Sequence, residues 1–104
     1  MNHTRALSPA FQAETAADYN GLPHARITET RGQAHVFTVS LHELEAWYLA
    51  LGGHITSQPA PAGSGVVLWT LHTSTGHGHG TPVIVHALAM DTDRPDADIT
   101  NAAA

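Results

Sequence analysis

The middle of the chain carries its most regular apolar pattern, a stripe with the spacing of an α-helix. The stripe consists of Leu41, Leu44, Tyr48 and Leu51, with Trp47 at its margin. Residues spaced three, seven and ten positions from the first lie on one side of a helix. Ser40, followed three residues later by Glu43, forms a capping box, and Gly52-Gly53 supply the left-handed residue that ends a helix. We therefore predict an amphipathic helix over residues 41–51.

Stretches rich in apolar and β-branched residues predict strands on both sides of this helix. They cover residues 27–39 with a break at Gly32, residues 54–58, residues 66–73 and residues 82–90. A glycine-rich segment joins the last two, which is typical of a β-hairpin. The pattern predicts an α+β fold, in which a small antiparallel sheet of three to five strands, with a β-α-β-β core, is packed on one face by the helix 41–51.

The ends of the chain are less regular. We divide the chain into an N-terminal arm over residues 1–23, an α+β domain over residues 24–90 and an acidic, disordered tail over residues 91–104. In the arm, Ser8 and Pro9 are typical of a helix start and Gly21 of a helix end. We expect this short helix to dock only marginally, because its apolar face is thin, mainly Phe11 and Tyr19.

The strongest strands look apolar on both faces. In residues 66–71, Val67, Trp69 and Leu71 alternate with Val66 and Leu68. A sheet with one solvated face alternates more cleanly between apolar and polar residues. One short helix covers only one face, so the second face needs the N-terminal arm, a second copy of the chain or a different protein.

Composition narrows the range of partners. The chain has 104 residues, a charged fraction of 12% and no Lys, and four Arg stand against nine carboxylates. Nucleic-acid binding depends on clustered Lys and Arg, so no nucleic-acid partner is expected. The absence of Cys excludes a disulfide framework. No signal-peptide pattern and no apolar run of about 18 residues occurs, so we expect a cytoplasmic protein without a membrane span.

Nine histidines are the unusual feature of the composition. His77 and His79 lie in the predicted hairpin tip, and His72 and His86 lie on the two strands that lead to it. Neutral imidazoles bind zinc and other divalent transition metals when several converge. These four residues are therefore a candidate metal site. We favour the other interpretation, a solvated loop in a Lys-free protein that uses His as a neutral polar residue, and therefore expect no cofactor, with zinc or another divalent transition metal as the alternative.

No residue pattern predicts catalysis. We interpret His42, Glu43 and Glu45 as an exposed helix surface rather than as acid–base groups. The chain lacks the nucleophile elbow of serine hydrolases, and its glycine-rich segment is not followed by the helix of a dinucleotide fingerprint. The aspartates of the tail lack the Gly and the terminal Glu of a calcium loop. An enzymatic or small-molecule-binding domain, with a pocket between helix and sheet, stays as an alternative.

The sequence favours a non-enzymatic protein-interaction or regulatory module, with a homodimer as one form. Such a module would bind protein through its uncovered sheet face or through a sheet edge. The candidate interaction residues are Trp47, Trp69, Ile84 and Leu88. Of these, Trp47 is expected at the edge of the helix stripe, where a partly exposed Trp could anchor an interface. The alternative, which we favour, is that Trp47 only covers the edge of the sheet.

Two segments resemble a group of small α+β proteins of unknown function from actinobacteria and their phages. Residues 36–53, VFTVSLHELEAWYLALGG, match the strand and the short helix of that group, and residues 80–85, GTPVIV, match the end of its hairpin. The resemblance covers about half of the chain. It implies a host with a GC-rich genome, and it transfers no catalytic residue.

Overall fold

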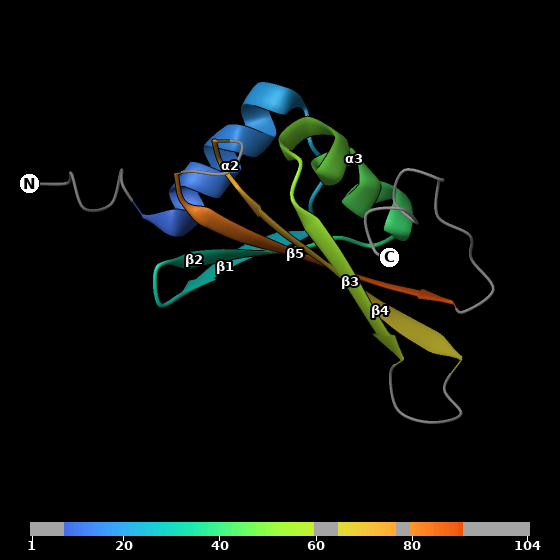
Figure 1. Ribbon diagram of the computed structural model, residues 1–104. Helices are drawn as coiled ribbons and strands as arrows, with labels where there is room; N and C mark the ends of the chain where they lie inside the picture. The colour runs from blue at the N-terminus through green and yellow to red at the C-terminus, as the bar shows by residue number, and fades with distance from the viewer. Residues whose placement is uncertain (1–7, 60–64, 77–79, 91–104) are drawn as a thin grey trace, which may run out of the picture.

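The computed structural model describes residues 8–59, 65–76 and 80–90. Its elements are α2 (Pro9–Asn20), β1 (Arg26–Thr30), β2 (Gln33–Phe37), α3 (Leu41–Leu51), β3 (His54–Pro59), β4 (Val66–Ser74) and β5 (Pro82–Met90). The strands form one sheet in the order β1-β2-β5-β4-β3. Figure 1 shows both helices on the same side of this sheet. The predicted α+β fold is confirmed.

The sheet is mixed, whereas the sequence predicted an antiparallel one. β2 and β5 run parallel, and the other three neighbouring pairs are antiparallel. The reason is the helix between β2 and β3, because a crossover lets the chain re-enter a sheet in its original direction. Two reversals then bring β5 alongside β2, where Ala34 lies opposite Val83. The last strand in sequence is thus the middle strand in space.

Helix α3 has the predicted bounds and the predicted capping. The Ser40 Oγ accepts a hydrogen bond from the Glu43 N–H at 3.2 Å. The Glu43 carboxylate in turn accepts a hydrogen bond of 3.0 Å from the N–H of Val39. In a capping box the expected donor is the N–H of the N-cap residue, here Ser40. Both contacts satisfy backbone donors at the start of the helix, which is the physical role of a capping box.

Three residues of the predicted apolar stripe of α3, Leu41, Leu44 and Leu51, are buried, but the fourth position differs. Trp47, expected at the margin and partly exposed, is fully buried, and Tyr48 is only half-buried. The Trp47 Nε1–H donates a hydrogen bond of 2.7 Å to the carbonyl of Pro23, in the segment between α2 and β1. This segment covers the side of α3 that the sequence analysis predicted to be partly exposed. The expectation that Trp47 is partly exposed is therefore wrong.

Helix α2 begins and ends as predicted, but it docks through different residues. Ala13 and Ala17 are its buried residues, whereas Phe11 is 48% exposed and Tyr19 is 89% exposed. Small side chains let the helix backbone lie close to β1 and β2, so alanine rather than an aromatic residue faces the sheet. Because α2 packs on β1 and β2, residues 9–20 join α3 in the helix layer of the fold.

The core lies between the two helices and one face of the sheet. Its largest fully buried side chains are Trp47, Leu44, Ile55, Leu71, Val36, Val83 and Val85. Since α2 and α3 contribute to the same core, α2 does not roof the second face of the sheet. The predicted tail over residues 91–104 lies outside the described residues. No helix in the described part of the chain has the length and apolarity that a membrane span requires.

Candidate interaction face

The sheet face turned away from both helices is called the open face below. It consists of the even-numbered residues of β1, β3, β4 and β5 and the odd-numbered residues of β2, as the strand register requires. On β5 the two sets differ plainly in exposure. Val83 and Val85 are fully buried toward the helices, whereas Leu88 and Met90 on the open face are 61% and 55% exposed.

One end of the open face is apolar across two strands. Leu88 lies directly opposite Leu68 of β4, and Met90 lies opposite Val66. Beside them, Phe37, Leu68, His86 and Leu88 line a hollow of about 540 Å³, together with the chain that leaves β2. This end offers a partner both an apolar surface and a depression to fill.

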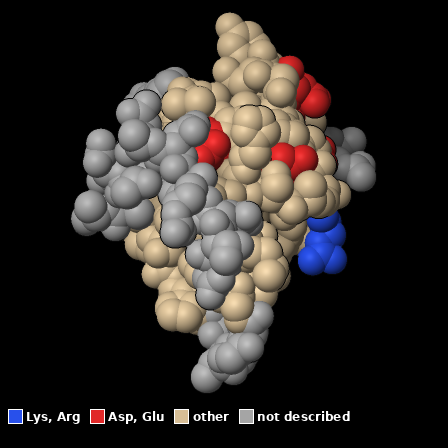
Figure 2. Space-filling view, turned by 90° about the vertical axis from the view of Figure 1, so that its right-hand side faces the viewer, with Lys and Arg blue, Asp and Glu red and all other residues tan. Residues whose placement is uncertain are grey.

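The described residues of the open face include no carboxylate. Glu29, the acidic residue of β1, points to the helix side, where its Oε1 accepts a hydrogen bond from the Ala10 N–H at 3.0 Å. The permanent charge of the face is Arg26, whose guanidinium lies over the Phe37 ring, 4.8 Å from its centre. In Figure 2 the visible acidic side chains lie in the upper half of the molecule, the half that holds the helices in Figure 1.

Histidines gather on this neutral face. His35, His54, His72 and His86 all lie on it, because their strands pair in register. The His35 Nδ1 and the His86 Nε2 are 3.1 Å apart, and the rings of His54 and His72 have their centres 6.2 Å apart. The sequence missed His35 and His54, since only the pairing of β2 with β5 and of β3 with β4 brings them to this cluster.

The His86 side chain contacts two rings. Its imidazole lies nearly parallel to the Phe37 ring, with ring centres 5.0 Å apart, and meets the His35 ring edge to edge through the two nitrogens, with ring centres 5.4 Å apart. Burial lowers the pKa of His86 below its ordinary value, and the neighbouring His35 and His72 lower this pKa further. The main chain is fixed as well, because the carbonyl of His86 accepts both the N–H and the Oγ1–H of Thr38, at 3.0 and 2.9 Å.

The predicted interaction residues divide between the two faces. Ile84 and Leu88 lie on the open face, whereas Trp69 lies on the helix side, half-buried against the core. Of the predicted metal ligands, His72 and His86 share the open face. His77 and His79 lie outside the described residues. Within residues 8–59, 65–76 and 80–90, no group of three or more His, Asp or Glu is arranged to hold a metal ion.

The acid–base reading of α3 gains no support. His42 is exposed, as expected, but Glu45 is buried, which corrects the expectation of an exposed side chain. The buried side of α3 is wide enough to include Glu45, which follows Leu44 in the helix. The Glu45 Oε1 lies 3.7 Å from the His42 Nδ1, a contact that becomes an ion pair only when His42 is protonated.

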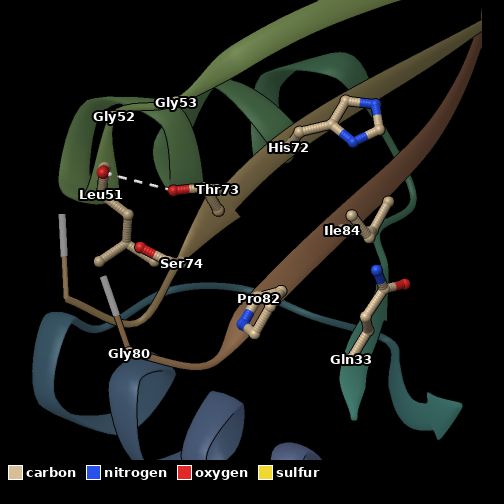
Figure 3. Close-up of a pocket in the computed structure, with 10 residues that line it drawn as sticks. All are labelled: Gln33, Leu51, Gly52, Gly53, His72, Thr73, Ser74, Gly80, Pro82 and Ile84. Carbon is tan, nitrogen blue, oxygen red and sulfur yellow. Dashed lines mark hydrogen bonds between the residues drawn. The ribbon is translucent and has the colours of Figure 1, made fainter. Parts of the chain in front are cut away.

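A second hollow lies at the end of the sheet rather than between a helix and the sheet. It measures about 690 Å³ and is bordered by the C-terminal end of α3, the end of β4 and the start of β5 (Figure 3). The Thr73 Oγ1–H closes one wall by a hydrogen bond of 3.3 Å to the carbonyl of Leu51. Among the described residues that line it, His72 is the titratable one and no carboxylate accompanies it. The described lining of the hollow thus offers no acid–base pair.

Comparisons of the chain with models of known protein families, with curated proteins and with solved structures found no match. The resemblance to actinobacterial and phage proteins therefore stays a prediction, and the functional argument rests on the open face itself.

Proposed function

We propose that the chain is a non-enzymatic protein-interaction module that forms a homodimer by packing the open faces of two copies together. The observation that carries this proposal is the pair Leu88 and Met90. Both are more than half exposed, on a sheet face that lies opposite both helices and that carries no carboxylate among its described residues. Exposed apolar surface of this kind marks interaction sites in soluble proteins.

A second copy is the partner that this face fits best. In a twofold dimer the same surface meets itself, so it must tolerate its own charges. A strongly acidic or basic face would repel its copy, whereas the open face presents neutral polar groups, imidazoles and Arg26, whose guanidinium already lies over Phe37. Its chemistry offers no cluster of permanent charge that would select a charged partner.

The dimensions of the face suit such an interface. Five strands spaced by about 4.8 Å make a sheet about 24 Å wide, and residues that rise by about 3.3 Å make a nine-residue strand about 30 Å long. The shorter strands reduce the projected area to roughly 500–700 Å², which is comparable with the roughly 800 Å² that each partner contributes to a standard interface.

The test compares two exposed leucines on opposite sides of the molecule. Leu88 is 61% exposed on the open face, and Leu49 is 67% exposed on α3. We expect the unaltered chain to sediment at micromolar concentration with about twice the 11.0 kDa mass of one chain. Leu88→Asp should shift it to the monomer, while Leu49→Asp should leave the dimer intact.

The expected size of the shift follows from burial. Covering the exposed part of one leucine contributes about 1–2 kcal/mol, and a twofold interface contains the residue twice. Losing this contact should raise the dimer dissociation constant about thirty-fold or more. A monomeric mass for the unaltered chain at 100 µM contradicts the proposal. If Leu88→Asp and Leu49→Asp weaken the dimer equally, the interface lies on another surface, such as an edge strand.

A further inference from the structure

We infer that the imidazoles of His35 and His86 form half of a transition-metal site, and that a second copy of the chain supplies the other half across the open face. This inference rests on the proposed dimer. The ligands would be four imidazole nitrogens, two from each copy. Such a donor set selects zinc, copper or nickel and not magnesium or calcium, which prefer oxygen ligands.

The first support is the distance between the two nitrogens. The His35 Nδ1 and the His86 Nε2 are 3.1 Å apart. Two imidazole nitrogens bound to one tetrahedral zinc, each at about 2.0–2.1 Å from the ion, are separated by about 3.3 Å. In the protein without metal, these two nitrogens are joined by a hydrogen bond, which the N–H of one ring donates to the unprotonated nitrogen of the other. To bind one ion, the two rings would have to turn from this arrangement, in which the nitrogens face each other, so that both nitrogens point toward the ion.

The second support is the position of His86. It is the middle residue of the nine-residue strand β5, and β5 is the middle strand of five. A twofold axis through the centre of the open face therefore passes close to His86. The two copies of His86 would meet there, each with its His35. Facing sheets pack about 10 Å apart, a gap that imidazoles approaching from both sides and an ion between them can span.

The third support is that one chain offers an incomplete site. A structural zinc site needs four ligands. The described residues of one chain contain no group of three or more arranged to hold a metal. The His35–His86 pair provides two nitrogens, and the main chain that carries His86 is held by two hydrogen bonds from Thr38 to its carbonyl. A second pair, brought by the dimer, completes the coordination.

The test is a zinc titration of the full chain after treatment with a chelator, followed by calorimetry and by sedimentation. We expect one zinc ion for every two chains, and a dimer dissociation constant that falls at least tenfold when zinc is present. Replacing zinc by cobalt should give the strong visible absorption of a tetrahedral site. His35→Gln and His86→Gln should each weaken zinc binding at least tenfold.

Two controls use histidines outside the pair. His42→Gln removes an exposed imidazole from α3, and the double substitution His77→Gln with His79→Gln removes the two histidines that lie between β4 and β5 in the sequence. Both variants should bind zinc like the unaltered chain. The inference is overturned by one zinc per chain, by zinc binding that survives His86→Gln, or by zinc binding that the double substitution abolishes.

The same measurements separate this inference from the proposed function. A chain that dimerises without zinc, loses the dimer on Leu88→Asp and binds no zinc supports the interaction module and overturns the metal site. A chain that stays monomeric both with and without zinc overturns both, whatever zinc it binds.

Discussion

Replacing Trp47 by Phe tests the contact that joins α2, its connecting segment and α3. Trp47 is fully buried, and its Nε1–H donates a hydrogen bond of 2.7 Å to the carbonyl of Pro23. Phenylalanine keeps an aromatic ring in the core, but it is smaller and has no donor. The substitution thus removes the hydrogen bond and some volume, and it introduces no charge.

The expected cost has two parts. The indole exceeds the phenyl ring by roughly 40 Å³, and about 24 cal/mol per Å³ of residual cavity gives about 1 kcal/mol. The carbonyl of Pro23 loses its partner in a partly buried place, which costs about 1–3 kcal/mol. Together these lower the free energy of unfolding by about 2–4 kcal/mol, a large share of the roughly 5–15 kcal/mol typical of a domain.

The assay is urea unfolding followed by far-ultraviolet circular dichroism, because removing a tryptophan disturbs fluorescence. All chains are compared at one concentration, since dimerisation makes stability depend on it. Trp69→Phe is the matched control. Trp69 is only half-buried, so we expect a loss below about 1.5 kcal/mol. If Trp47→Phe lowers the free energy of unfolding no more than Trp69→Phe does, the hydrogen bond to Pro23 does not have the role given to it.

Three further outcomes can be measured by the same unfolding assay. The pKa of His86 is lowered in the folded chain by burial and then by its histidine neighbours, so the unfolded chain binds more protons. The free energy of unfolding of the metal-free protein should therefore decrease as the pH falls below the ordinary histidine pKa of about 6.5. His86→Gln should make this decrease smaller. If the variant and the unaltered chain show the same pH dependence, His86 is not its cause. Gly53→Ala should cost about 3 kcal/mol or more, because a Cβ there would collide with the carbonyl oxygen of His72 at a φ of 118°. Gly32→Ala, at a φ of 82° with open space around it, should cost only about 1 kcal/mol, and equal losses would show that the close approach is unimportant. Ser40→Ala removes the acceptor at the start of α3 and should cost about 1 kcal/mol; no loss would mean that the cap contributes nothing.

Local signals predicted the elements well, because caps and glycines act over a few residues. The bounds of α3 follow from Ser40 and Gly52, and the start of α2 follows from Ser8. Which side of a helix is buried is a different question, since it depends on neighbours that are distant in sequence. Trp47 is buried because the segment containing Pro23 covers it, and no local pattern reports that contact.

Pairing between distant strands limited the prediction of the site. The approach of His35 and His86 depends on the parallel register of β2 with β5, across about half of the chain. The sequence grouped His72 with His86 because an antiparallel hairpin is a local structure. It also identified Ile84 and Leu88 as residues of an uncovered face, since alternation along one strand separates them from Val83 and Val85.

The position of β5 has a consequence for how the chain is made. A ribosome synthesises this strand after the other helices and strands of the described residues, yet both β2 and β4 need it as a neighbour. Until it emerges, the nascent chain holds two separate hairpins with inner edges that no strand pairs, and such edges promote aggregation. Completion of the sheet must also wait for contacts across a long loop, which slows folding. Ribosome stalling or truncation before residue 82 should therefore be far more damaging than changes of similar length near the start of α2.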